Sequence, residues 1–169
     1  MKNTRLNKNS NFMHPISIQI ATDEAPSPKK AVLRRWATRV LKTQPKQGEM
    51  TIRIVDINEM TILNKTFRKK EGPTNVLSFP YIVPADVALF SPVLGDIVIC
   101  AKVVEKEAKE QHIMWEAHWA HMVVHGIYHL LGYDHETDHD AICMEKQESD
   151  SMQSLGFNNP YINRENDIS

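Results

Sequence analysis

Residues 115–135 read WEAHWAHMVVHGIYHLLGYDH, and this stretch decides the plan of the fold. Apolar residues occupy nearly every face of a helix drawn through Trp115–Leu131, which predicts a helix that is buried on all sides. Glu116 and four histidines make the same stretch too polar for a membrane span. Gly132 stands where a glycine commonly ends a helix in the left-handed conformation. We therefore expect a buried central helix, after which the chain doubles back.

The segments around this helix show patterns of both strands and helices. Alternating or continuous apolar residues predict four short strands, at 16–20, 50–55, 76–79 and 96–100. Helical spacing predicts four further helices, at 29–41, 57–67, 101–111 and 139–155. In the last of these, the residues expected to face inward are Ile142, Met144, Met152 and Leu155. The fold class is α+β, with a small mixed four-stranded sheet packed with about four to five helices.

Composition limits the organisation of the chain. At about 150 residues per domain, 169 residues predict one domain. We expect that domain at 14–157, between a flexible tail at 1–13 and a polar tail at 158–169. Twenty Lys and Arg against 21 Asp and Glu give a net charge of −1, which excludes a globally basic nucleic-acid binder but allows a local basic patch. Two cysteines without a CxxC motif and an N-terminus without an apolar stretch favour a cytoplasmic protein.

Seven of the eight histidines lie between His112 and His139, and three of these have the spacing of a metal site. His125 and His129 are four residues apart, so a helix places them about 40° apart in angle and about 6 Å apart in rise. Two imidazoles so placed can bind one metal ion, and His135 can return to it after the turn at Gly132. Three protein ligands leave a position for water, as in catalytic zinc sites. We expect one Zn²⁺ per chain, although nickel and copper accept the same ligands.

Other histidines offer alternatives to this assignment. His121 with His125, and His135 with His139, are also spaced four residues apart, but neither pair is followed by a glycine turn and a third histidine. Histidines of a buried helix are also commonly core residues with hydrogen-bond partners, which is the role that we expect for His118 and His121. Cys143 is expected to be a buried thiol rather than a fourth ligand.

The spacing H-x-x-x-H-x-x-G-x-x-H is shared with the metzincin peptidases. Those enzymes carry a glutamate directly after the first histidine as general base, whereas this chain has Gly126, which cannot accept a proton. A peptidase of that mechanism is therefore disfavoured. A zinc site remains compatible with hydrolysis, because zinc lowers the pKa of bound water to about 7 without help from a carboxylate.

The stretch His125–His135 resembles the signature of the YbeY family of bacterial metallo-endoribonucleases, also called rRNA maturation factors. Two further blocks agree with it: LNKTFR at 63–68 followed by PTNVLSFP at 73–80, and LGDI at 94–97. The resemblance covers roughly residues 50–156. Two positions depart from the pattern of the family, with Tyr128 in place of the usual leucine and Asn75 where aspartate is common.

The resemblance implies a single-strand-specific, zinc-dependent endoribonuclease that acts in 3′-end maturation of small-subunit rRNA and in ribosome quality control. It also implies zinc bound by His125, His129 and His135, and it matches the functional arginine of the family to Arg68. The expected partners are single-stranded RNA and the ribosome or small-subunit ribosomal proteins. The alternatives are a non-enzymatic ribosome-assembly factor with structural zinc and, less favoured, a metallopeptidase.

The chemistry of the side chains agrees with these roles to different degrees. The guanidinium fork of Arg68 can bind two phosphoryl oxygens while negative charge develops on them. Thr74 and Asn75 are candidate contacts to phosphate or base, although turn capping explains them nearly as well. Asp134 is a candidate to orient a histidine ligand or accept a proton, and capping of the helix end is equally compatible with its position.

Overall fold

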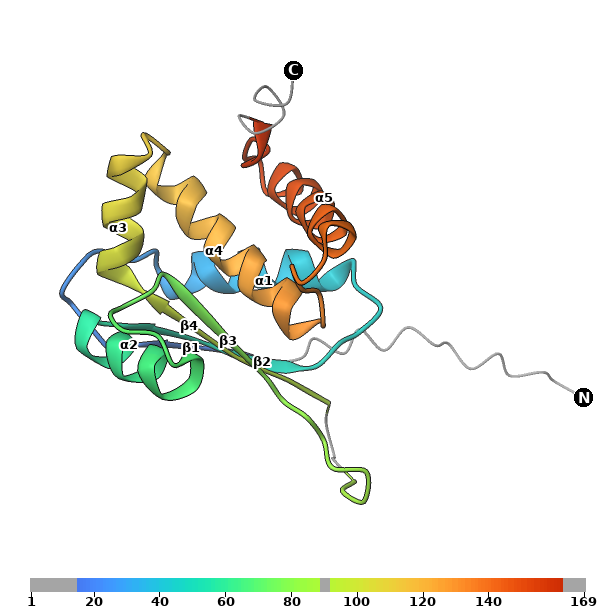
Figure 1. Ribbon diagram of the computed structural model, residues 1–169. Coiled ribbons are helices and arrows are strands. Elements are labelled where there is room, and N and C mark those ends of the chain that lie inside the picture. Colours follow the sequence, from blue (N-terminus) through green and yellow to red (C-terminus); the bar gives the residue numbers. More distant parts are fainter. Residues whose placement is uncertain (1–14, 89–91, 163–169) are drawn as a thin grey trace, which may run out of the picture.

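The computed structural model describes residues 15–88 and 92–162, and its centre is a four-stranded sheet in the order β1-β2-β4-β3 (Figure 1). Three strands run parallel and β3 is antiparallel to β4. The strands are β1 Ile16–Ile20, β2 Glu49–Val55, β3 Val76–Pro80 and β4 Val93–Cys100. The expected α+β fold with a mixed sheet is confirmed, while the predicted tail at 1–13 lies outside the described residues.

Five α-helices and one π-helical turn cover the two faces of the sheet. α4 and α1 lie on one face, α5 packs against α4, and α2 lies on the opposite face (Figure 1). The helical elements are α1 Lys30–Lys42, α2 Ile57–Leu63, the π-helix η1 Asn64–Arg68, α3 Ala101–Glu110, α4 Trp115–Leu130 and α5 Asp138–Ser154. Within the described ranges, no helix is long and apolar enough to cross a membrane.

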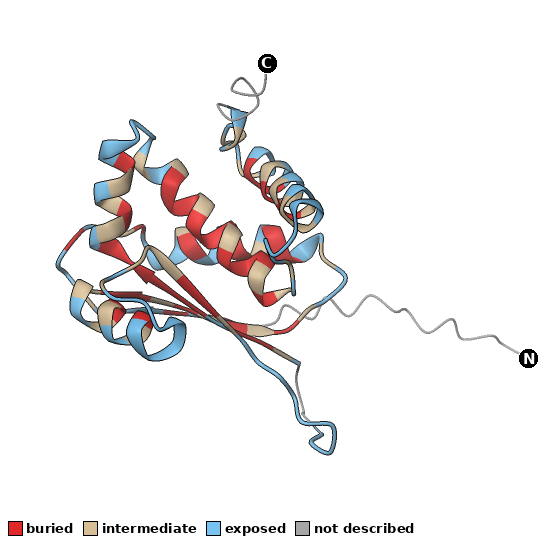
Figure 2. Cartoon of the chain, viewed as in Figure 1, coloured by how far each residue is buried: buried red, intermediate tan, exposed pale blue. Residues whose placement is uncertain are grey.

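The burial of β4 shows why its sequence is almost continuously apolar. Ile97 and Ile99 point into the larger core under α4, whereas Val98 and Cys100 point into a smaller core under α2. A strand that is covered on both faces cannot alternate with polar residues. Most of the central helix α4 is buried in the same way (Figure 2). Trp119 and Ile127 have no exposed surface.

The region predicted as a single helix at 57–67 is divided into two parts. After α2 the helix continues as the wider π-helical turn η1. Lys69 ends this turn in the left-handed conformation, at φ 58°. The buried Asn64 secures this turn, because its Nδ2 donates a 2.9 Å hydrogen bond to the carbonyl of Gly72. π-Helical turns often occur at functional sites, and this one carries Arg68 as its last residue.

Helix α5 turns three of its four predicted residues inward, because Met144 and Met152 are buried and Leu155 packs against the core. Ile142 is 66 % exposed, so its prediction as an inward residue was wrong. The buried face contains Met144, Glu148 and Met152, and Ile142 lies about 200° around the helix from Met144. A carboxylate therefore occupies a position on the buried face of this helix.

Candidate metal centre

Two histidines of the candidate metal centre lie on one face of α4, and the third returns to them after a turn. Gly132 ends the helix at φ 99°, and the Tyr133 amide donates a hydrogen bond to the carbonyl of Tyr128. The ring centroids of His125 and His129 are 4.6 Å apart, and His135 lies 5.2 and 5.1 Å from them. One ligand nitrogen from each ring lies within 4.8 Å of the others. The structure thus brings the three predicted histidines together.

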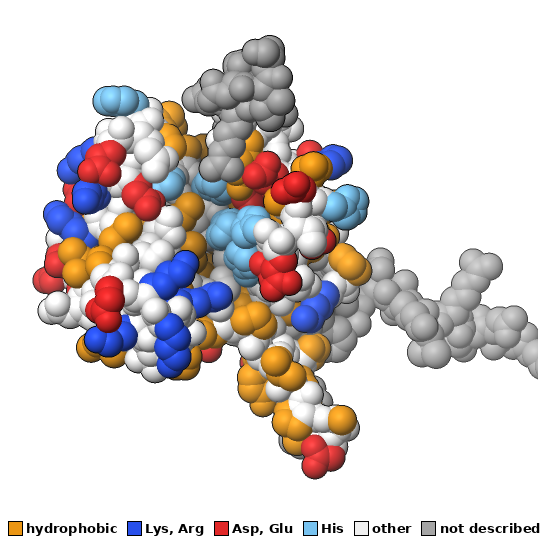
Figure 3. Space-filling view, in the orientation of Figure 1, with side chains coloured by type: hydrophobic (Ala, Val, Ile, Leu, Met, Phe, Trp, Pro, Cys, Tyr) orange, Lys and Arg blue, Asp and Glu red, His pale blue; other side chains and the backbone are white. Residues whose placement is uncertain are grey.

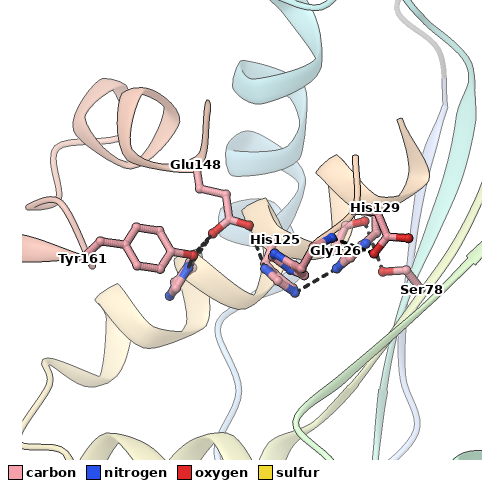
Figure 4. Close-up of polar contacts among 9 residues, drawn as sticks. Ser78, His125, Gly126, His129, Glu148 and Tyr161 are labelled. Atoms are coloured by element: carbon pink, nitrogen blue, oxygen red, sulfur yellow. Dashed lines mark hydrogen bonds and ion pairs between the residues drawn. The ribbon is translucent and has the colours of Figure 1, made fainter. Parts of the chain in front are cut away.

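The hydrogen bonds of His125 determine which of its nitrogens is free for a metal. Its Nδ1 lies 2.7 Å from Oε1 of Glu148, a carboxylate with no exposed surface (Figure 4). An ionised carboxylate only accepts hydrogen bonds, so Nδ1 carries the proton. The other ring nitrogen of His125, Nε2, faces Nε2 of His129 at 3.1 Å.

The electrostatics of the centre favour an uncharged His129 and a charged Glu148 carboxylate. Burial, followed by the nearby His125 and His135, lowers the pKa of His129 to about 4. Burial alone raises the pKa of Glu148, but hydrogen bonds with His121 and His125 outweigh burial and hold that pKa well below its usual value. Neutral imidazole is the form that binds metals, so His129 is held in that form. The three histidine nitrogens, all within 4.8 Å of one another, fit a divalent transition metal.

A cavity of about 440 Å³ opens beside the histidines. The polar side chains that line it are Asn75, His121, His125, His135, Glu145 and Tyr161. The start of β3 therefore contributes to the same hollow as α4 and the C-terminal segment. Such a volume accommodates a small organic group such as a nucleotide next to the metal ligands.

Comparison with protein families matches residues 17–156 to the family described as Endoribonuclease YbeY. The chain belongs to the YbeY endoribonuclease family. Among solved structures, the solution structure of TM1509 from Thermotoga maritima is similar, with a TM-score of 0.57 and 25 % sequence identity. That similarity covers 91 % of this chain and 94 % of the other. The range matched to the YbeY family contains all three histidines, Arg68 and Glu148, and it ends before Tyr161.

Arg68, which the resemblance had suggested as the functional arginine, ends η1 on the surface. Within the part of the chain that the structure describes, its guanidinium forms no hydrogen bond or ion pair. Lys and Arg side chains gather over α2 and η1 next to the histidines (Figure 3). The neighbouring Lys65 pairs with Glu71 at 3.1 Å, and Nζ of Lys69 donates to the carbonyl of Thr66. The Arg68 side chain is thus available to bind an anion.

Two further candidates from the sequence are held by the protein itself. Asn75 donates through Nδ2 to both carboxylate oxygens of Glu107, at 3.2 and 3.1 Å, and its Oδ1 accepts from the amide of Val76. Asp134 accepts a 2.7 Å hydrogen bond from the backbone amide of His135. The carboxylate that contacts the ring of His125 is Glu148 rather than Asp134. Thr74 is half-buried next to Asn75.

The remaining histidines have partners of their own. His118 is 4 % exposed and bonds Glu107 at 2.7 Å through Nε2, as expected for a core histidine. His121 contacts Glu148 at 2.9 Å through Nε2, and its ring lies edge-on to that of His125. His139 lies 3.7 Å from the sulfur of Cys143, which is half-buried rather than buried as predicted.

Sequence reasoning did not identify Glu148 or Tyr161 as parts of this centre. Glu148 lies four residues from both Met144 and Met152, so it falls on the apolar stripe of α5. A carboxylate in the middle of an apolar stripe needs a buried partner. The sequence therefore did contain a signal for the role of Glu148. Tyr161, which the sequence assigned to a polar tail, contacts Glu148 with its hydroxyl (Figure 4).

Proposed function

We propose that this chain is a zinc-dependent endoribonuclease that cleaves single-stranded RNA during 3′-end maturation of small-subunit rRNA and in ribosome quality control. Membership of the YbeY family supports endonucleolytic cleavage of RNA. The observation that carries the proposal is the convergence of three imidazoles beside a cavity and a basic surface.

The residues that would hold the metal are His125, His129 and His135. When bound, the metal supplies Lewis acidity at the phosphodiester and lowers the pKa of a water molecule. Because Nδ1 of His125 donates to Glu148, this ligand presents a lone pair on Nε2 without having to lose a proton. Zinc suits a site of three histidines with an open position.

Arg68 supplies positive charge to the phosphate that is cut. Cleavage of a phosphodiester increases the negative charge on its non-bridging oxygens, and a guanidinium fork can bind two such oxygens at once. The exposed position of Arg68 at the end of η1 supports this role. Thr74 and Asn75 would contact the sugar–phosphate backbone beside it, with Asn75 held at the wall of the cavity by Glu107.

An exposed aromatic ring next to Arg68 supports a preference for single strands. Phe67 is 59 % exposed, and its ring packs edge-on against Phe79 with a centroid distance of 5.1 Å. Proteins that bind single-stranded RNA combine cationic side chains with aromatic rings on which unpaired bases stack. A duplex keeps its bases stacked on one another and cannot use this ring.

The proposal is tested by comparing cleavage of one RNA sequence as a single strand and as a duplex. The protein is assayed zinc-loaded, stripped with a chelator, and restored with zinc. We expect cleavage of the single strand only, its loss on stripping and its recovery with zinc. Tight RNA binding without cleavage under all three conditions would instead support an assembly factor. Association with ribosomal proteins and a cytoplasmic location belong to the same proposal.

A further inference from the structure

Glu148 is a buried carboxylate whose partners belong to the candidate metal centre. Its exposed fraction is 0 %, and in the described part of the chain no lysine or arginine pairs with it. Its hydrogen bonds go to Nδ1 of His125 at 2.7 Å, to Nε2 of His121 at 2.9 Å and to the hydroxyl of Tyr161. A buried charge is tolerated only with such a full set of partners, so its orientation is strongly fixed.

The two oxygens of Glu148 have separate partners. Oε2 accepts from both His121 and Tyr161, whereas Oε1 accepts, among the residues that the structure describes, from His125 alone. The side chain therefore cannot rotate toward His125 or away from it without breaking the contacts of the other oxygen. In consequence the ring of His125 is held by one oxygen at a fixed position.

The same atoms also admit a different interpretation. Donor atoms of His121, His125 and Glu148 lie within 4.8 Å of one another, which is a grouping that could hold a second metal ion. Two observations favour hydrogen bonding instead. The contacts of 2.7 and 2.9 Å are hydrogen-bond lengths, and Glu148 is inaccessible. A metal ion there would also displace the proton on Nδ1 of His125. That N–H group now donates a hydrogen bond to the carboxylate.

We propose that Glu148 is a positioning residue that fixes His125 in its Nδ1-protonated tautomer, so that Nε2 points at the site shared with His129 and His135. This inference rests on the proposed metal centre. Through Glu148, α5 and the C-terminal segment with Tyr161 would support the metal centre. Carboxylate partners of histidine ligands commonly raise metal affinity 10- to 100-fold, which sets the expected effect.

The first test measures zinc affinity by competition with a chelator for the parent, Glu148→Gln and Glu107→Gln. Glu107 is a matched control, since it pairs at 2.7 Å with His118, a histidine on the same helix that lies outside the metal set. We expect Glu148→Gln to bind zinc about 10- to 100-fold more weakly. Its cobalt absorption spectrum should also be altered, whereas Glu107→Gln matches the parent in both. Equal affinity and spectrum for Glu148→Gln would overturn the proposal, as would two metal ions per chain in the parent.

A second measurement needs no variant and remains decisive if Glu148→Gln does not fold. Nitrogen chemical shifts of the metal-free parent report the tautomer of His125 directly. We expect a proton on Nδ1 and none on Nε2, and the reverse would overturn the proposal. These readouts are independent of RNA cleavage. A parent that binds zinc and does not cut RNA would refute the proposed function while leaving the role of Glu148 to be decided by affinity and tautomer.

Discussion

Gly126 of α4 lies so close to Ile97 of β4 that a side-chain carbon at position 126 would come within 2.8 Å of the Cγ2 atom of Ile97. The helix that carries His125 and His129 therefore meets the sheet through bare backbone. The hydroxyl of Ser78, on β3, donates a 3.1 Å hydrogen bond to the carbonyl of Gly126. The contact gives a structural reason why the glutamate of metzincin peptidases has no room at this position.

Replacing Gly126 with alanine should destabilise the protein. The added methyl group would overlap two atoms of the Ile97 side chain, and overpacking of this kind costs about 1–3 kcal/mol. Alanine alone favours a helix by up to about 1 kcal/mol over glycine, so the overlap outweighs the gain. Urea unfolding measures the change. In an Ile97→Ala background the penalty should disappear, and an equal penalty in both backgrounds would show that the overlap is not its cause.

Replacing Arg68 with alanine should abolish most cleavage while leaving zinc binding intact. Removing one group that stabilises developing charge commonly lowers kcat by about 10²–10³-fold. Lys70→Ala is the control, because Lys70 is an exposed cation of the same loop. Cleavage rates and zinc content are measured for both variants. Normal cleavage by Arg68→Ala would refute the assigned role, and Arg68→Lys should recover little, since an ammonium lacks the planar fork.

Replacing Phe67 with alanine should weaken the binding of single-stranded RNA. Stacking of one base on an aromatic ring contributes about 1–3 kcal/mol, so KM should rise by about 5- to 150-fold. Ile62→Ala removes another exposed apolar side chain, 65 % exposed, and serves as the control. Phe67→Trp should retain the parental KM. A fall in kcat at unchanged KM would contradict a stacking role.

The central helix and its metal ligands could be predicted because their signals are local. Four-residue spacing places His125 and His129 on one face, and Gly132 ends the helix where His135 can return. Both features depend only on the geometry of one helix and one turn. The same holds for the four strands, whose apolar runs are visible without knowledge of their neighbours.

Features that depend on how elements meet could not be predicted in the same way. The antiparallel position of β3 at the edge of the sheet, beside β4, is set by pairing between strands, which periodicity does not encode. Glu148 lies 23 residues from His125, and their contact depends on how α5 packs on α4. The wrong prediction for Ile142 has the same origin, because several faces of α5 carry apolar residues. The widening at η1 is a local departure that a helical period cannot detect.

The metal-free protein should lose stability as the pH falls from 6.5 toward 4. The pKa of His129 is about 4 in the folded state, against an ordinary value of 6.5. In this window the unfolded chain binds the proton and the folded chain does not, so acid favours unfolding. The contribution of His129 is fully present above pH 6.5 and is lost progressively toward pH 4.

Urea unfolding of the metal-free protein at a series of pH values checks this dependence. In a His129→Gln variant the free energy of unfolding should fall less steeply across the same window, because glutamine does not titrate. His139→Gln, which removes an exposed histidine, should keep the parental slope. Identical slopes for the parent and His129→Gln would rule out His129 as the source.

The most direct test of the account is cleavage of a single-stranded RNA by the parent, His129→Ala and His139→Ala, purified side by side and assayed for zinc. Because Nε2 of His129 lies 3.1 Å from Nε2 of His125, removing this ring should eliminate the metal centre, whereas His139 is outside it. We predict zinc and cleavage in the parent and in His139→Ala, and neither in His129→Ala. Equal cleavage by all three proteins, or cleavage by His129→Ala without zinc, would contradict a metal-dependent nuclease at these histidines.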